Sequence, residues 1–174
     1  MKKLIPFLAT LICLISTSCA QFSPAPDHLQ DQYFSEEIQQ FEVLDQNGNS
    51  VSLKSILQKH EGKKVVLDFW ASWCKDCRKG MPILQALQTE TENVNYVFFS
   101  MDKSTERWLN AIVKMNIQGD HYFIKEGWGS NKLTDYLGLD WIPRYLVLDE
   151  KGKILLAKAI EADDKELREI VLKK

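Results

Sequence analysis

The sequence predicts an α/β domain in which a central mixed β-sheet is flanked by helices on both faces. Two apolar runs rich in β-branched and aromatic residues, 65–70 and 94–100, are typical of buried strands. Each run is followed by apolar residues at helical spacing, within 82–87 and 108–115, and Asn93 marks the expected end of the first of these two helices. Because strands that alternate with helices usually pair in parallel, these segments predict the parallel centre of one sheet.

A β-hairpin is expected before the central strands, as an N-terminal extension of the core. Strand-like runs at 41–44 and 50–53 flank Asn47-Gly48, a pair that favours the tight turn of a hairpin. Residues 54–60 then form a short helix or a loop, which ends at Gly62.

The chain after the second central strand predicts a crossover helix, a connection and a closing hairpin. Ser104 is a candidate N-cap, because its hydroxyl can accept a hydrogen bond from a free helical amide. The elements expected are a helix over 104–115, a short strand at 121–124, a short helix at 131–137, hairpin strands at 145–148 and 153–159 around Lys151-Gly152, and a last helix with Leu167, Ile170 and Val171 on one face.

Charge and length limit the functions that the chain can have. The formal net charge is −2 with acids and bases interspersed, so we expect no nucleic-acid partner and no basic membrane-binding segment. About 150 mature residues form one domain that buries roughly 70% of its unfolded surface without disulfide staples. A cysteine pair in such a domain is therefore free to serve a reaction.

The N-terminus has the three parts of an export signal, assigned to residues 1–20. A basic start is followed by the apolar run 4–15 and then by small residues. The run is shorter than the roughly 20 residues that span a bilayer, so a removable signal is favoured over a permanent transmembrane helix. We therefore expect an exported protein of the periplasm, an oxidising compartment.

Two routes of signal cleavage are open. An ordinary signal peptidase could cut after Ala20, whereas 16–19 resembles a loose lipobox, without its usual leucine, in which Cys19 becomes the acylated first residue. The lipoprotein route is favoured, because this cysteine would otherwise be discarded with the signal. Residues 21–40 are then a tether and lead-in, part of which could be a short amphipathic helix, and 41–174 form the domain.

Cys74 and Cys77 form the motif that says most about function. They stand where a predicted strand passes into a predicted helix, and the free amides of a helix start stabilise a thiolate at the first cysteine. Zinc needs about four ligands, yet the other cysteines lie in the leader and the histidines are scattered singly. A structural disulfide would close a single helical turn, which contributes little stability. A reactive dithiol is favoured, and no metal or cofactor is expected.

The segment from Val65 to Arg78 resembles the thioredoxin superfamily, and specifically its exported TlpA/ResA-like branch. The likeness covers about residues 41–174, because separate points also match, among them Phe41-Glu42-Val43-Leu44-Asp45, Ser100-Met101-Asp102, Ile142-Pro143 and Leu148-Asp149-Glu150-Lys151-Gly152. The resemblance implies a thioredoxin-like fold and an exported thiol–disulfide oxidoreductase. It also implies protein disulfide or dithiol substrates and an upstream thiol electron donor, such as a membrane-embedded reductase.

Three residues are expected to carry the reaction. Cys74 is the nucleophile that attacks a substrate disulfide, and Cys77 resolves the mixed disulfide. Asp68 stands in the middle of an apolar strand, where burial would raise its pKa, and the resemblance implies that it exchanges a proton with Cys77. The alternative for Asp68 is an outward-facing carboxylate that only adds solubility.

Substrate binding is assigned to residues beside the dithiol. Pro143 resembles the cis-proline of this superfamily, although most bonds before proline are trans. A cis bond would hold the Ile142 backbone where an extended substrate can pair with it, and Trp73 is expected to cover the site. Trp70 is either a second cover or part of the core.

Several residues depart from the family pattern. Asp76 replaces a common proline, Gly80 stands where many relatives of this branch have Glu, and Arg144 follows the cis-proline position where Thr is usual. The specificity of a relative therefore does not carry over to this chain. Loop or core roles are assigned to four residues that could otherwise line the substrate side, Asp102, His121, Glu126 and Trp128.

The function predicted is an exported disulfide reductase that acts through a mixed-disulfide intermediate. In the motif Cys74-Lys75-Asp76-Cys77, the lysine favours the thiolate, whereas the aspartate competes with it for the helix-start amides. We therefore expect a reducing potential, nearer to the roughly −270 mV of thioredoxin than to the roughly −120 mV of the strong oxidant DsbA. Two alternatives are a thioredoxin-fold binding or assembly module without turnover, and a thiol peroxidase, which lacks support because no separate Thr-x-x-Cys motif is present.

Overall fold

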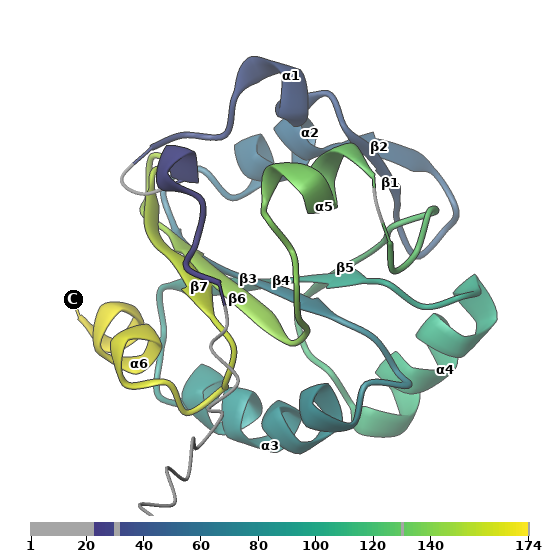
Figure 1. Ribbon diagram of the computed structural model, residues 1–174. Helices are drawn as coiled ribbons and strands as arrows, with labels where there is room; N and C mark the ends of the chain where they lie inside the picture. Colours follow the sequence, from purple (N-terminus) through teal and green to yellow (C-terminus); the bar gives the residue numbers. More distant parts are fainter. Residues whose placement is uncertain (1–22, 30–31, 130, 174) are drawn as a thin grey trace, which may run out of the picture.

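A mixed seven-stranded β-sheet organises the part of the chain that the computed structural model describes, residues 23–29, 32–129 and 131–173. The strand order is β2-β1-β5-β4-β3-β6-β7 (Figure 1). The strands are β1 (Glu42–Leu44), β2 (Ser50–Ser52), β3 (Lys64–Trp70), β4 (Val94–Ser100), β5 (Asp120–Phe123), β6 (Arg144–Leu148) and β7 (Ile154–Ala159). The helices are η1 (Asp27–Leu29), α1 (Glu36–Gln39), α2 (Leu53–Lys59), α3 (Lys75–Thr89), α4 (Thr105–Met115), α5 (Lys132–Tyr136) and α6 (Lys165–Leu172).

The predicted export signal and Cys19 lie outside the described residues. Within the described ranges, no helix is long and apolar enough to cross a membrane.

The centre of the sheet is parallel, as the alternation of strands and helices predicted. β3 pairs in parallel with β4, and β4 with β5, whereas β6 and β7 add antiparallel strands beyond β3. The N-terminal hairpin belongs to the same sheet, because β1 pairs with β5. The predicted mixed sheet with a hairpin extension is therefore confirmed.

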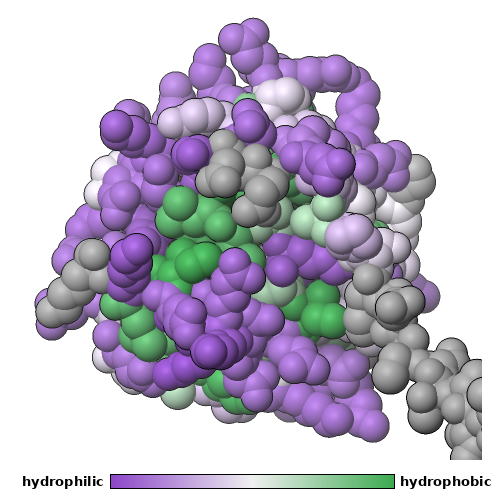
Figure 2. Space-filling view, turned by 60° about the vertical axis from the view of Figure 1, so that its left-hand side comes forward, coloured by the Kyte–Doolittle hydropathy of each residue, from purple (hydrophilic) through white to green (hydrophobic). Residues whose placement is uncertain are grey.

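Helices cover both faces of the sheet (Figure 1). α3, α4 and α6 lie on one face, whereas α1, α2 and α5 lie on the other. The crossovers β3-α3-β4 and β4-α4-β5 step in the same direction across the sheet, and right-handed crossovers then place both helices on one face. The side of the molecule beside β7 and α6 is mostly hydrophilic, with hydrophobic residues in a central area (Figure 2).

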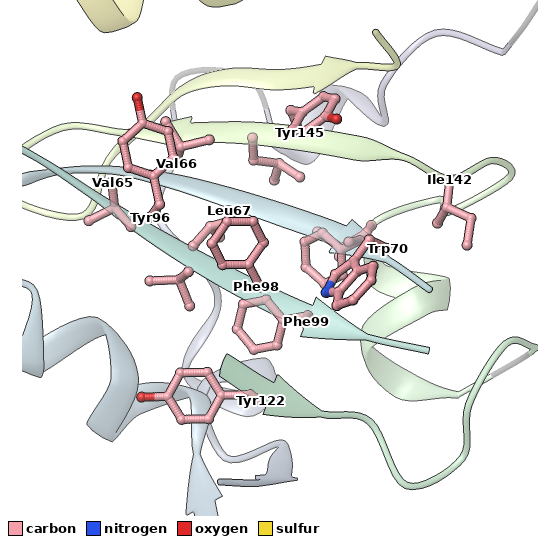
Figure 3. Close-up of a cluster of buried hydrophobic side chains, with 14 of the residues drawn as sticks. Val65, Val66, Leu67, Trp70, Tyr96, Phe98, Phe99, Tyr122, Ile142 and Tyr145 are labelled. Atoms are coloured by element: carbon pink, nitrogen blue, oxygen red, sulfur yellow. The ribbon is translucent and has the colours of Figure 1, made fainter. Parts of the chain in front are cut away.

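The core is built on β3 and β4, which are buried along most of their length. Strands covered on both faces need continuous apolar composition, and this is the pattern that the sequence carries. Phe69 stacks on Phe99, and Phe98 on His121, each pair with ring centroids 5.0 Å apart. Figure 3 shows these strands with their side chains, and Trp70 at the end that leads to the cysteines. His121 thus belongs to the core.

The lead-in before β1 is folded onto the domain. Leu29, Phe34 and Ile38 are buried in the same hydrophobic core as the central strands. The Ser35 hydroxyl accepts a hydrogen bond from the Ile38 amide at 3.4 Å and caps α1. Of the alternatives left open for this segment, a short helix is present.

Two element boundaries differ from the prediction. Leu53 begins α2 instead of ending β2, because the Ser52 hydroxyl accepts a hydrogen bond from an amide of the first helical turn at 3.2 Å. α3 ends at Thr89, before the expected end at Asn93. Thr91 donates its hydroxyl to a carbonyl of the last turn at 3.2 Å and so satisfies one of the groups that a helix end leaves free.

Candidate active site

The two cysteines lie at the predicted junction between β3 and α3. Cys74 is the N-cap of α3, and its Sγ accepts a hydrogen bond from the Cys77 amide at 3.0 Å. The two sulfurs form a disulfide of 2.07 Å. Cys74 is 6% exposed and Cys77 1%, so Cys74 is the sulfur nearer to solvent. Once the bond is reduced, the amides at the helix start stabilise a Cys74 thiolate.

The loop before β6 faces the disulfide. The Ile142–Pro143 peptide bond is cis, which confirms the expectation from the resemblance. The Ile142 carbonyl oxygen lies 3.5 Å from Cys74 Sγ, although the two residues are 68 positions apart in the sequence. The backbone of Ile142 therefore stands beside the sulfur that is nearer to solvent.

Asp68 is buried at the centre of β3. It is 1% exposed, so the alternative of an outward-facing carboxylate is wrong. Burial raises the pKa of Asp68 well above its ordinary value, and its Oδ1 has no hydrogen-bond partner within the described residues. Tyr145 lies directly opposite on β6; burial raises the pKa of this tyrosine, and the Asp68 charge adds to the shift. A carboxyl group in this setting holds its proton to higher pH than an ordinary aspartate.

Three exposed tryptophans surround an apolar hollow beside Cys74. Trp73, Trp128 and Trp141 are 44%, 44% and 41% exposed. With Ile142 they line a hollow of about 280 Å³ that reaches Cys74. Trp73 and Trp128 meet edge to face, with ring centroids 6.4 Å apart. The disulfide is thus bordered by large apolar surfaces that stand open to a ligand.

Sequence reasoning missed two of these tryptophans. It assigned Trp128 to a loop or the core and gave Trp141 no role, whereas both reach the site from loops. The sequence left open whether Trp70 covers the site or belongs to the core. Trp70 is fully buried and so belongs to the core. An aromatic residue in a loop at the edge where parallel strands end is a useful sign of a site-lining residue, because such loops meet around one site.

Asp102 fixes the loop that leads from β3 to Cys74. Its carboxylate is 1% exposed and accepts hydrogen bonds from the Ser72 amide at 3.0 Å, the Ser72 hydroxyl at 2.6 Å and the Ser100 hydroxyl at 2.9 Å. The sequence assigned Asp102 a loop or core role and missed these contacts, because Ser72 lies 30 positions away. The approach to the dithiol is therefore attached to the end of β4.

Two departures from the family pattern have structural reasons. A Cβ on Gly80 would lie 3.2 Å from the Tyr145 hydroxyl, so this tyrosine fills the space that a side chain would need. Arg144 is fully buried and pairs with Asp140, which also pairs with Lys158 at 2.9 Å. The buried arginine thus anchors the loop that precedes the cis bond.

Known proteins resemble this chain in sequence. The model of a family described as thioredoxin-like matches residues 62–154. Thioredoxin-like protein YneN of Bacillus subtilis is 36% identical over 105 residues, which cover 58% of this chain and 59% of that protein, so the chain spans about three fifths of YneN. Thiol-disulfide oxidoreductase ResA of Bacillus anthracis is 27% identical over 177 residues, which cover 100% of this chain and 98% of that protein.

Solved structures resemble it in fold. A thiol-disulfide oxidoreductase from Bacteroides fragilis superposes with a TM-score of 0.62 and 25% identity, over 75% of this chain and 96% of that chain. The thioredoxin domain of a thiol-disulfide oxidoreductase from Bacteroides vulgatus gives a TM-score of 0.60 and 26% identity, over 75% of this chain and 92% of that chain.

Proposed function

The chain belongs to the thioredoxin-like family, and we propose that it is a thiol–disulfide oxidoreductase that works as an exported disulfide reductase. The observation that carries the proposal is the position of Cys74 Sγ, which lies at the start of α3 and borders an open apolar hollow. Cys77 lies behind it, almost fully buried. An accessible nucleophile with a protected second thiol is the arrangement that disulfide exchange needs.

The reaction runs in two exchange steps. The Cys74 thiolate attacks one sulfur of a substrate disulfide, and the other sulfur leaves with the bonding electron pair and takes up a proton. The Cys77 thiolate then attacks Cys74 Sγ in the mixed disulfide and releases the second substrate thiol. The protein ends with the Cys74–Cys77 disulfide, and the substrate has gained two electrons and two protons.

Asp68 acts in the second step as a proton acceptor. Cys77 must lose its proton before it attacks, and a carboxylate whose pKa burial has raised is a stronger base than an ordinary aspartate. Ile142 and Pro143 offer backbone to an extended substrate, and Trp73 covers it from the other side. These roles rest on the 3.5 Å approach of Ile142 to Cys74 and on the burial of Asp68.

The reduced protein must be restored after each turnover, which requires an upstream thiol donor. A membrane-embedded reductase suits an exported protein, and a lipid on Cys19 would keep the domain at the periplasmic face of a membrane. Intact-mass analysis of the mature protein tests the anchor. A lipid-modified N-terminal Cys19 is expected, and an unmodified N-terminus at Gln21 contradicts it.

Reduction of insulin by dithiothreitol tests the proposed function. The wild-type protein should accelerate the reaction, and Cys74→Ser should remove the acceleration. Cys77→Ser should stop at the mixed disulfide, so that substrate proteins stay attached to Cys74. No acceleration, together with indifference to Cys74→Ser, would favour a binding module without turnover.

A further inference from the structure

The edge-to-face pair of Trp73 and Trp128 borders two hollows of different character. The first is the apolar hollow that reaches Cys74. The second has a volume of about 720 Å³ and is lined by the same two tryptophans. The charged residues that line this second hollow come from the β4–α4 segment and from the loop after β5; they are Asp102, Lys103, Arg107, Lys125 and Glu126.

The second hollow is cationic, although the chain as a whole has a formal net charge of −2. Lys103, Arg107 and Lys125 are exposed, and no ion-pair partner is present for them among the described residues. The Asp102 carboxylate is buried and is occupied by its serine donors. Three free cations therefore face one exposed carboxylate, that of Glu126.

We propose that the second hollow is a substrate subsite for an acidic side chain of the protein segment whose disulfide Cys74 attacks. The subsite rests on the proposed function. It defines the substrate class as a protein segment with an apolar side chain beside the attacked cysteine and a carboxylate a few residues further along. The apolar side chain fills the hollow at Cys74, the segment crosses the Trp73–Trp128 pair, and the carboxylate meets Lys103 and Lys125.

Free surface charges of this kind act mainly on encounter and orientation. Their field extends over about 10 Å at 0.1 M salt and is screened at higher salt. They therefore raise the association rate of an oppositely charged segment and lower that of a like-charged one. The apolar hollow contributes through burial, which salt does not screen, so the two subsites can be told apart by their response to ionic strength.

Four synthetic peptides separate the two subsites. Each carries one cysteine as a 2-pyridyl disulfide, with phenylalanine or serine beside it and two glutamates or two lysines beyond. The thiolate of reduced protein attacks the peptide sulfur, the S–S bond breaks, and the released 2-thiopyridone reports the rate. At low salt, the glutamate peptides should react roughly tenfold faster than the lysine peptides, and the difference should shrink to about twofold at about 1 M salt. The phenylalanine peptides should react faster than the serine peptides at both salt concentrations.

Two variants and a matched control assign these preferences to residues. Lys103→Glu combined with Lys125→Glu should abolish or invert the preference for glutamate, and either single change serves if the pair does not fold. Trp128→Ala should weaken the preference for phenylalanine. Lys151→Glu reverses an exposed charge in the β6–β7 turn, at the end of β6 away from Pro143, and should keep both preferences.

The outcomes distinguish this inference from the proposed function. Equal rates for glutamate and lysine peptides at low salt would overturn the acidic subsite and leave disulfide exchange at Cys74 intact. A preference that Lys151→Glu loses as much as the double reversal would also overturn it, because net charge alone would then be the cause. Release of thiopyridone at equal rates by the wild type and Cys74→Ser would instead contradict the proposed function.

Discussion

Asp68 and Asp102 are both 1% exposed, yet their surroundings are opposite in kind. Asp102, just beyond β4, accepts three hydrogen bonds from Ser72 and Ser100. Asp68, in the neighbouring strand β3, has an oxygen without a partner among the described residues, and burial raises its pKa. The hydrogen-bond donors around a buried carboxyl group thus decide whether it can fix a backbone segment.

Both carboxyl groups act on the same junction between β3 and α3. Asp102 holds Ser72, two positions before Cys74, and so limits how the loop to the dithiol can move. Asp68 lies in the strand that leads into this loop, opposite Tyr145. Asp102 therefore serves the geometry of the site, whereas the role proposed for Asp68 is proton exchange, and substitutions can test the two roles separately.

Asp102→Ala should have the largest effect on stability. It leaves the Ser72 amide and two hydroxyl groups without their acceptor in a buried place, and we expect a loss of about 2–4 kcal/mol in the free energy of unfolding. Urea denaturation of the oxidised protein measures it.

Asp45→Ala is the matched control for this experiment. Asp45 also accepts three hydrogen bonds, from the Asn47 amide and from the amide and side chain of Asn49, but in an exposed turn where water can replace it. Asp45→Ala should therefore lower the free energy of unfolding much less than Asp102→Ala does. Equal costs at the two positions would show that the Asp102 donors are not desolvated, and would remove the distinction between a buried and an exposed cluster.

Asp68→Asn should leave the fold intact and slow turnover by roughly tenfold to a hundredfold, because Cys77 loses its proton acceptor. The insulin assay across neutral pH measures this, with circular dichroism as the check on folding. Glu150→Gln, an exposed change in the β6–β7 turn, is the control and should keep wild-type rates. Unchanged kinetics in Asp68→Asn would mean that the buried carboxyl has no part in the second exchange step.

The pH dependence of stability should show the same carboxyl group titrating. The folded state holds the Asp68 proton to higher pH than the unfolded chain, whose aspartates titrate near pH 3.9. The stability that this proton supplies is complete below the unfolded pKa and is lost as the pH rises through the folded pKa. Asp68→Asn cannot ionise, so its stability should rise relative to that of the wild type over this range. A difference that stays constant with pH contradicts the raised pKa.

Features set by local composition could be predicted from the sequence. β3 and β4 must be apolar because both of their faces are covered. The Cys74–Cys77 pair is recognisable because it stands where an apolar strand is followed by a helix. The burial of Asp68 followed from its neighbours in the same strand. The cis state of Pro143 came from the family resemblance alone, since nothing local distinguishes it.

Features set by distant contacts could not be predicted in this way. Asp102 meets its partner across 30 positions, and Trp128 and Trp141 reach the site from separate loops. A loop tryptophan has the same local pattern as a core tryptophan, so only the assembled sheet edge reveals its place. The position of β5 between β1 and β4 likewise depends on strand order, which local periodicity does not encode.

Asp76 is an exposed carboxylate near the dithiol, and its substitution should have the smallest effect, a small change in the reduction potential. Its side chain is 50% exposed in the first turn of α3, and its Oδ1 lies 3.9 Å from Lys79 Nζ. The negative charge competes with a Cys74 thiolate for the helix-start amides, so Asp76→His should stabilise the reduced state and raise the reduction potential. Solvent and Lys79 both screen the Asp76 charge. The expected shift in the reduction potential is therefore only about 15–30 mV.

Equilibration with glutathione buffers measures the potential directly. Lys79→Gln is the opposite test, because it removes the counter-charge of Asp76 and should lower the potential slightly. An unchanged value in Asp76→His would show that solvent screens the carboxylate completely and that it acts only at the helix start. A wild-type potential at or above about −180 mV, the level of protein disulfide isomerase, would contradict the reductase direction itself, since a site of that strength would oxidise its partners.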